Sequence, residues 1–561
     1  MLILLLVCQL GLILNIQLVK ASGTIYIRAD GSIDPSTANI TTSDYVTYTF
    51  TDNNYDSIVV ERDNIVIDGK GYTVEGTGSG TGISLSDRNN VTIKNMVVRA
   101  FERGIRLDDS SNNTISANNV TYNEYGIVLY HSSSKNTLRH NDASDNRYNL
   151  GIFTASASGY IQDIDDSNTV NGKPVYYWAN RRDMAVPLDA GYVVLVNCTR
   201  ITVKNLNLAN NMQGVALAFT TDSIITNNNL MNNFDGVRLD HSSNNNVISG
   251  NNITANTCYG IRLFYDPSAS PMSTNNVGIS KYGNQIDGPS CNNAIYGNNI
   301  TNNGSAIRLD YPSNNTISAN NVINNSAEGI GLYGSSSNNT VSGNNIVNNS
   351  YGIWFYGSYS NLIYHNNFID NTPQVYPSFN SNFWDAGYPS GGNYWSNYLG
   401  NDFQQGLGQN LSGSDGIGDA THYRDNYPLM GIFSDFNATS EYHVQTICNS
   451  TISGFKFNGT AISFNVSGEN ETTGFCRMCI PTALMNNTFT VLVNSTLVDY
   501  YILLCSNDTH NYLYLIYNHS TQEVIIIAEF PSALILPLFI MATLLAVIMY
   551  IKKTSKSRKL Q

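Results

Sequence analysis

A short motif, Gly-Ile-x-Leu, recurs along this 561-residue chain and limits its fold more than any other feature. The motif or a close variant of it begins at Gly104, Gly126, Gly236 and Gly352, among others. Most neighbouring copies are 22 to 24 residues apart, and the wider spacings of 46 and 88 residues are close to multiples of that unit. A fixed period of this length indicates a solenoid, in which each repeat forms one turn of a stack. Because such a stack grows in one dimension, the chain does not need one large globular core.

Each repeat contains short stretches in which apolar and polar residues alternate, separated by turns rich in Ser, Asn and Gly. In one repeat, Val237 and Leu239 point to one side of a strand, while Arg238 and Asp240 point to the other. Three such strands fill a repeat and leave no room for a helix. The sequence therefore predicts an all-β fold, a parallel β-helix with three strands per coil and 22–24-residue coils.

Asparagine is abundant at the corners of the repeats, as in the Asn-Asn pair at 251–252. Its amides can stack in hydrogen-bonded ladders between equivalent coils, and it tolerates the left-handed conformation that turns require. We therefore expect most of these asparagines to be architectural.

The repeats resemble the NosD-like right-handed parallel β-helix family over about residues 58–432. A long excursion at 168–178 (NTVNGKPVYYW) strengthens the resemblance, as do the closing segments 392–398, 415–419 and 425–429. The resemblance implies right-handed coils of a carbohydrate-binding or sugar-hydrolase type, and the family's namesake assists copper loading of an exported reductase. Similar sequences are common among archaeal surface proteins, and the segment 529–532 resembles an archaeal C-terminal sorting signal.

Apolar runs stand near both ends of the chain. Residues 1–22 are typical of a secretory signal peptide, with an uncleaved N-terminal anchor as the alternative. The run 533–551 fits one membrane crossing, and the basic residues after it indicate a cytoplasmic tail. We therefore expect a single-pass protein of the cell membrane whose bulk is extracellular, and sequons such as Asn437 and Asn494 predict a glycoprotein. A net charge of −13 disfavours nucleic acid as a partner.

These patterns divide the chain into seven segments. They are a signal peptide (1–22), an N-terminal β cap (23–57), the parallel β-helix (58–372), its C-terminal closing segment (373–436), a small antiparallel β-sandwich (437–528), a transmembrane helix (530–551) and a basic tail (552–561).

Arginine and aspartate recur together on one outward side of the repeat, near tyrosines, and such a surface suits a polysaccharide. The alternative interpretation is a solvated ladder of weak ion pairs. The residues predicted to bind a ligand are Arg106, Asp108, Arg238, Asp240, Arg308, Asp310 and Tyr333, and Tyr130, Tyr311 and Tyr356 accompany them.

Hydrolysis or lyase chemistry needs two carboxylates about 5–10 Å apart, or a basic group beside a metal-bound uronate. Asp108 and Asp109 are adjacent on a strand and should point apart, unless the turn has already begun. The better catalytic candidates lie in the excursion, although a charged solvent loop explains them as well: Asp163, Asp165, Asp166 and Asp183.

The sequence can be tested for two kinds of metal site, one for calcium and one for copper. Asp415 and Asp419 lie on a Gly-rich turn and are candidates for calcium, with a plain turn as the alternative. Copper is disfavoured, because His131 and His241 occupy the same slot of repeats several coils apart and cannot share an ion.

Four of the eight cysteines fall in the predicted sandwich, where they can form two disulfides outside the cell. These are Cys448, Cys476, Cys479 and Cys505, and their pairing stays open. The Cys476-x-x-Cys479 motif is alternatively a redox or metal site.

The leading hypothesis is a membrane-anchored surface protein whose β-helix binds a glycan or another envelope component without catalysis. The alternatives are a polysaccharide hydrolase or lyase and, third, a copper-handling accessory protein.

Overall fold

The computed structural model describes residues 23–268, 278–280, 283–285, 287–377, 381–485, 488–528, 540–541 and 543–549. The chain forms two compact units: unit 1 comprises Met1–Ala294 and Asn298–Ser313, and unit 2 comprises Ile295–Gly297 and Asn314–Gln561. The predicted signal peptide, the basic tail and most of the predicted transmembrane helix (530–551) lie outside the described residues. Within the described ranges, no helix has the length and apolar character needed to cross a bilayer.

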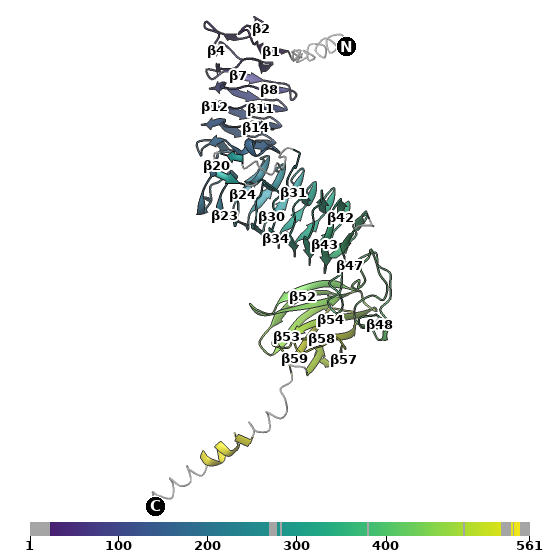
Figure 1. Ribbon diagram of the computed structural model, residues 1–561. Helices are drawn as coiled ribbons and strands as arrows, with labels where there is room; N and C mark the ends of the chain where they lie inside the picture. Colours follow the sequence, from purple (N-terminus) through teal and green to yellow (C-terminus); the bar gives the residue numbers. More distant parts are fainter. Residues whose placement is uncertain are drawn as a thin grey trace, which may run out of the picture. The chain divides into compact units, whose positions relative to one another are not determined.

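Unit 1 begins with a stack of coils in which β8 (Thr81–Ser86), β11 (Arg103–Asp108) and β14 (Tyr125–Tyr130) lie one above another (Figure 1). Equivalent residues align in rows, and Ile83, Ile105 and Ile127 of one row are buried in the bore. The predicted parallel β-helix is therefore confirmed. Its stacking starts at Thr24, because β1 (Thr24–Ile27) already pairs in parallel with β5 (Ser57–Val60). The short strands β2 (Ile33–Asp34) and β3 (Ile40–Thr41) pair antiparallel with β1 and β4 (Thr47–Phe50) at the edges of this first coil.

Three sheets make up this first stack. The first contains β1 (Thr24–Ile27), β2 (Ile33–Asp34), β5 (Ser57–Val60), β8 (Thr81–Ser86), β11 (Arg103–Asp108), β14 (Tyr125–Tyr130) and β17 (Tyr148–Phe153). The second contains β3 (Ile40–Thr41), β4 (Thr47–Phe50), β6 (Val66–Asp68), β9 (Thr92–Lys94), β12 (Thr114–Ser116), β15 (Thr137–Arg139) and β18 (Asp163–Ile164). The third contains β7 (Thr73–Glu75), β10 (Val97–Arg99), β13 (Asn119–Thr121), β16 (Asp142–Ser144) and β19 (Thr169–Val170).

The regular stacking is interrupted in the middle of unit 1. A 3-10 turn, η1 (Ala157–Tyr160), follows β17, and β20 then pairs antiparallel with β19. A second stack grows from β20, and the last coil of the first stack lies against it: the Met212 N–H donates to the Leu150 carbonyl at 3.1 Å. The segment predicted as a long excursion, 168–178, thus contributes β19 and most of β20 to the sheets.

The second stack also has three sheets. One contains β20 (Lys173–Ala179), β22 (Tyr192–Val196), β25 (Gln213–Ala218), β28 (Asp235–Asp240), β31 (Tyr259–Phe264) and β36 (Ser305–Asp310). The second contains β21 (Arg182–Ala185), β23 (Thr199–Lys204), β26 (Ile224–Thr226) and β29 (Val247–Ser249). The third contains β24 (Asn207–Ala209), β27 (Asn229–Met231), β30 (Asn252–Thr254) and β35 (Asn299–Thr301).

Buried asparagines form the predicted amide ladders at the corners of the coils. In unit 1, the Asn228 side chain donates to the Asn251 side-chain oxygen at 3.0 Å, and Asn251 donates in the same way to Asn298 at 3.0 Å. The same oxygens accept backbone N–H groups, so each amide satisfies polar groups that burial would otherwise leave unpaired. The architectural interpretation of these asparagines is confirmed.

Unit 2 starts with further coils of the same kind. Its ladder runs from Asn344 through Asn366 to Asn393, whose backbone N–H donates to the Asp425 carboxylate at 2.7 Å. Trp395 donates to the same carboxylate, so Asp425 ends the ladder in the closing segment. The sheets contain β37 (Thr316–Ser318), β40 (Thr340–Ser342), β43 (Tyr359–Tyr364) and β46 (Ser381–Phe383); β38 (Asn321–Ile323), β41 (Asn345–Val347), β44 (Asn367–Ile369) and β47 (Tyr394–Trp395); and β39 (Glu328–Tyr333), β42 (Tyr351–Tyr356) and β45 (Val375–Tyr376).

The predicted antiparallel sandwich follows the coils of unit 2 (Figure 1). Its first strand begins at Ile432, five residues before the predicted boundary. One sheet has the order β50 (Ile432–Asn437), β51 (His443–Cys448), β54 (Thr473–Pro481), β58 (His510–Asn518) and β57 (Tyr500–Ile502). The other has the order β52 (Thr451–Phe457), β53 (Ala461–Ser467), β59 (Gln522–Ala528), β55 (Phe489–Val493) and β56 (Thr496–Leu497). Apolar side chains such as Phe464, Met478 and Leu513 fill the core between them.

Candidate functional site

Five aromatic side chains gather on the outward side of β39, β42 and β45 in unit 2. We call Tyr333, Tyr351, Trp354, Tyr356 and Tyr376 the aromatic platform. The Trp354 ring lies 4.4 Å from the Tyr376 ring and 4.5 Å from the Tyr351 ring, and the Tyr333 ring is nearly parallel to it at 6.5 Å. Tyr356 and Tyr376 remain 70% and 45% exposed. The rings therefore support one another while presenting apolar surface to solvent.

Register between the coils brings the platform together. Trp354 lies beside Gly331 on one neighbouring strand and beside Tyr376 on the other. A Cβ at Gly331 would meet the Tyr333 ring at 2.8 Å and the Glu328 carboxylate at 3.1 Å, so glycine leaves room for the ring. The Tyr333 hydroxyl donates to Glu328 at 3.3 Å, which places a buried carboxylate beside the platform.

Sequence reasoning named two members of the platform, Tyr333 and Tyr356, and missed Tyr351, Trp354 and Tyr376. The signal was present: the motif of this repeat, Gly-Ile-Trp-Phe-Tyr, has an aromatic residue at both polar positions of the strand. Tyr376 follows the last regular repeat, and only the register of β45 with β42 places it beside Trp354.

The predicted charged row exists in the second stack of unit 1. Arg238, Arg262 and Arg308 occupy equivalent positions of β28, β31 and β36. Asp310 accepts from Arg262 at 3.0 Å and from Arg308 at 2.9 Å. The Arg262 guanidinium also lies 4.1 Å from the Phe264 ring centroid. These contacts hold Arg262 and Arg308 in place, and the Arg308 side chain is more exposed than that of Arg262.

Arg238 and Asp240 point away from the bore as predicted, yet they are buried rather than solvated. The chain between β17 and η1 covers them: Arg238 donates to the Thr154 carbonyl at 3.0 Å, and Tyr160 donates to Asp240. This cover interrupts the open Arg-Asp surface that the sequence predicted. The repeat contains no signal for a contact between the two stacks. Burial also raises the pKa of nearby Asp235 to about 6.

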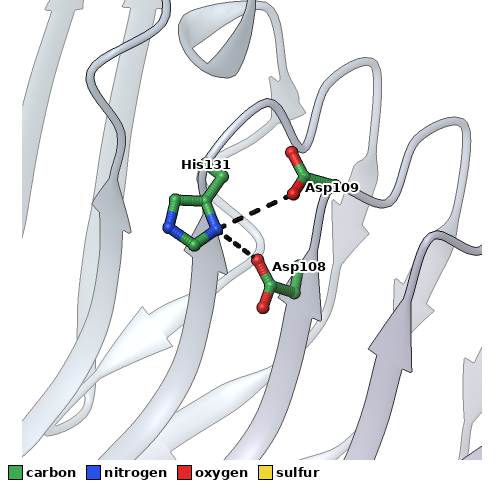
Figure 2. Close-up of side chains that lie close together, drawn as sticks. All are labelled: Asp108, Asp109 and His131. Carbon is green, nitrogen blue, oxygen red and sulfur yellow. Dashed lines mark hydrogen bonds and ion pairs between the residues drawn. The ribbon is translucent and has the colours of Figure 1, made fainter.

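Two acids and a histidine meet in the first stack of unit 1 (Figure 2). The His131 Nδ1 lies 2.5 Å from an Asp108 oxygen and 3.8 Å from an Asp109 oxygen. Asp109 has a positive φ of 47°, so the turn has begun and its carboxylate shares a side with that of Asp108. Among the described residues, this is the only group of three metal-ligating side chains whose ligand atoms lie within 4.8 Å of one another.

This Asp108–Asp109–His131 cluster was missed because the two acids were expected to point apart. The signal lies in the repeat: Asp109 and His131 both stand five residues after the Gly of successive units, Gly104 and Gly126. Arg106 forms an ion pair with Asp108 in the same place. His241, in the same slot further along, is buried and contacts Asp287 at 2.9 Å.

The four acids predicted as catalytic do not form a pair of free carboxylates. Asp163 and Asp165 both contact Arg139, at 2.7 and 3.0 Å, while Asp183 contacts Arg200 at 2.5 Å. The hydrogen bond from Arg200 lowers the pKa of Asp183. Asp166 is exposed. The contacts of Asp163 and Asp183 are ion pairs between neighbouring coils, because β15 pairs with β18 and β21 pairs with β23.

Asp415 and Asp419 organise turns in the closing segment. Asp415 is buried and accepts the Ile417 N–H at 3.1 Å, while Asp419 accepts the N–H groups of Phe403 and Gln404. Their carboxylates therefore already have backbone donors. Calcium at this turn stays a prediction.

The comparisons with known proteins agree with the repeat architecture. The family model described as periplasmic copper-binding protein (NosD) matches residues 182–309 and 264–400, and the model described as right handed beta helix region matches residues 21–169. These matches support a NosD-like right-handed parallel β-helix, with the NosD model on the second stack and the coils after it and the general β-helix model on the first stack. No curated protein sequence matches this chain.

Solved structures that match this chain at low sequence identity include the following three. The Dettilon tailspike protein is 13% identical, with 84% of this chain and 87% of that chain covered and a TM-score of 0.27. The periplasmic alginate epimerase AlgG is 12% identical, with 58% and 80% covered and a TM-score of 0.25. The DFA-IIIase from Arthrobacter chlorophenolicus A6 is 16% identical, with 51% and 63% covered and a TM-score of 0.21.

Proposed function

We propose that this protein is a cell-surface protein that binds a polysaccharide through the aromatic platform of unit 2, without catalysing a reaction on it. The observation that carries the proposal is the exposed cluster of Trp354 with four tyrosines on a rigid sheet. Five aromatic rings left partly open to water are costly to maintain unless a partner covers them.

The chemistry of the platform suits a sugar chain. The apolar faces of pyranose rings pack on Trp and Tyr rings, while the tyrosine hydroxyls and the Glu328 carboxylate can exchange hydrogen bonds with sugar hydroxyls. The parallel strands of a β-helix are about 4.8 Å apart. An extended polymer lying across β39, β42 and β45 would therefore meet aromatic rings at each coil it crosses.

A binding role is favoured over hydrolysis or lyase chemistry. The predicted catalytic acids Asp163, Asp165 and Asp183 contact arginines, and Glu328 is the buried acid at the platform. A single carboxylate does not supply the acid and base pair that glycoside hydrolysis uses. Hydrolysis of a bound polysaccharide that is lost in Asp165→Asn would favour the enzymatic alternative.

The binding proposal is tested with the full-length chain on an array of neutral and acidic glycans. Trp354→Ala should weaken binding of any captured glycan by about tenfold, since a buried stacking contact is worth about 1.4 kcal/mol. Tyr359→Ala is the matched control, because Tyr359 is a 50% exposed tyrosine of unit 2 on the separate strand β43. Binding that survives Trp354→Ala, or an array without any captured glycan, contradicts the proposal.

A second candidate function, metal handling, is favoured by the Asp108–Asp109–His131 cluster. Imidazole and carboxylate are a donor set that suits Cu²⁺ and Zn²⁺. The cluster lies outside the residues that match the copper-binding family model. Metal analysis of the protein after dialysis against each ion tests this candidate, and stoichiometric metal that disappears in His131→Ala would support it.

The surface location is part of the proposal. The apolar run 533–551, followed by basic residues, supports a membrane anchor with the coils outside. Protease treatment of intact cells tests it: loss of unit 1 from the cells is expected, while full protection contradicts an exposed position.

A further inference from the structure

Two cysteines of the sandwich stand directly opposite each other. Cys448 ends β51 and faces Cys476 of β54, its partner in the antiparallel register. Both side chains point into the sandwich core, where they are 1% and 0% exposed. Their thiols share a hydrogen bond, which lowers the pKa of Cys448 to about 7 and raises that of Cys476. The Cys448 sulfur also lies 3.2 Å from the Tyr517 hydroxyl.

The other two cysteines belong to the opposite face of the same sheet. Cys479 is three residues beyond Cys476 on β54, and an odd separation along a strand reverses the direction of a side chain. Arg477 shares this outer face with Cys479, and its guanidinium lies 4.0 Å from the Cys505 sulfur. Cys505 is among the groups that raise the pKa of Cys479, so the two thiols lie within electrostatic reach.

We infer that Cys448 and Cys476 are the two ends of a disulfide, and that Cys479 pairs with Cys505. Of the three possible pairings of four cysteines, only this one joins thiols that lie on the same face of the sheet. The inference does not depend on glycan binding by the coils.

Oxidation by an organic disulfide such as glutathione disulfide balances the reaction. The Cys448 thiolate attacks one sulfur of the oxidant, forms a mixed disulfide and releases one glutathione thiolate. The Cys476 sulfur then attacks the Cys448 sulfur and releases the second. Two protein thiols lose two electrons and two protons, and the oxidant becomes two glutathione thiols. Both cysteines are buried in the folded sandwich, out of reach of the oxidant, so the disulfide forms while the chain folds.

The bridge would link the neighbouring strands β51 and β54 of one sheet and close a loop that contains two strands of the other sheet. Between Cys448 and Cys476 the chain leaves the first sheet, forms β52 and β53 of the second sheet, and returns. Linking the ends of this excursion restricts the unfolded chain and stabilises the folded sandwich.

The test is a peptide map of the full-length chain after reduction, unfolding and refolding with glutathione disulfide. Free thiols are alkylated before digestion. Cleavage after Arg477 separates Cys476 from Cys479, and a second cleavage after aromatic residues such as Tyr500 separates Cys479 from Cys505. Linked peptides joining Cys448 to Cys476 and Cys479 to Cys505 are expected. Alkylation of both Cys448 and Cys476, or a bond from Cys476 to Cys479 or Cys505, would overturn the inference.

Thermal unfolding of a variant provides a second readout. In Cys479→Ser/Cys505→Ser, reductant should lower the unfolding midpoint of the sandwich by about 10 °C, because only the Cys448–Cys476 bridge remains. With Cys448 and Cys476 also changed to Ser, reductant should have no effect on that transition. An equal response of both variants to reductant contradicts the assignment, and the peptide map decides if a variant fails to fold.

Discussion

The coils and the sandwich use the same amino acid in opposite ways. In the coils of unit 1, asparagines such as Asn228 and Asn251 are buried and hydrogen-bonded in ladders. In the sandwich, the described sequon asparagines are exposed and the core contains apolar side chains and thiols. The sequon asparagines are Asn437, Asn449, Asn458, Asn465, Asn470, Asn494, Asn507 and Asn518.

The difference follows from repetition. A buried amide is tolerated only if its donors and acceptors are satisfied. Stacked coils bring an identical amide to the same corner at every turn, so each one satisfies the next. The antiparallel strands of the sandwich have no such repetition, and burial there favours groups with little hydrogen-bonding demand.

The largest expected effect comes from breaking a ladder in the coils. The Asn251 side chain donates to the Ile225 carbonyl and to Asn298, and it accepts from Asn228; Asn251→Ala removes all three hydrogen bonds. We expect the free energy of unfolding of unit 1 to fall by about 4 kcal/mol, because several buried groups lose their partners. Urea unfolding followed by circular dichroism measures the change.

The neighbouring residue provides the control for this ladder. Asn252 is exposed; its side chain donates to Asn229 at 2.9 Å and accepts from Asn299 at 3.0 Å, and both of these hydrogen bonds are open to solvent. Asn252→Ala should cost about 0.5 kcal/mol. Equal losses at positions 251 and 252 would show that the buried ladder is not what stabilises the coils.

A somewhat smaller effect is expected where the sandwich does bury a charge. Arg477 is 2% exposed and donates to the carbonyls of Asp415 at 2.9 Å and Pro389 at 2.7 Å, both in the closing segment of unit 2. Arg477→Met should destabilise unit 2 by about 3 kcal/mol, since two buried carbonyls lose their donor. The fluorescence of the buried Trp384 and Trp395 reports the unfolding.

Lys456→Met is the matched control for Arg477, because Lys456 is an exposed cation of the same sandwich. Its loss should leave the unfolding curve within about 0.5 kcal/mol of the unchanged protein. If both variants behave alike, the closing segment does not depend on the sandwich for its stability.

The smallest effect concerns pH and a histidine in the last coils. His365 is buried, stacks on Phe433 at 4.0 Å and contacts the Ser390 carbonyl, and burial lowers its pKa from 6.5 to about 4. Between these values the unfolded chain binds a proton that the folded protein does not. The free energy of unfolding of unit 2 should therefore fall by about 2 kcal/mol from pH 7 to pH 5.

Comparing variants isolates this contribution. His365→Gln should remove that part of the pH dependence, whereas His443→Gln, at an exposed histidine, should keep it. An unchanged pH profile in His365→Gln would assign the effect to other groups.

The sequence predicted the β-helix, the ladders and the sandwich because each follows from a local period. It did not predict that β20 reverses against β19, since no residue in the repeat marks that contact, and so Arg238 was expected in solvent. The Asp108–Asp109–His131 cluster depends on one backbone angle at Asp109. Tyr333 was found from its repeat position, but the platform around it depends on register across three coils.

The central claim is that Trp354 and its neighbouring tyrosines contact a glycan. A crystal structure of the full-length protein with the tightest-binding oligosaccharide from the array tests it most directly. The account predicts a sugar ring packed about 4 Å above the Trp354 ring, with the oligosaccharide running across β39, β42 and β45. An oligosaccharide bound on another surface, with the platform still open to water, would contradict it.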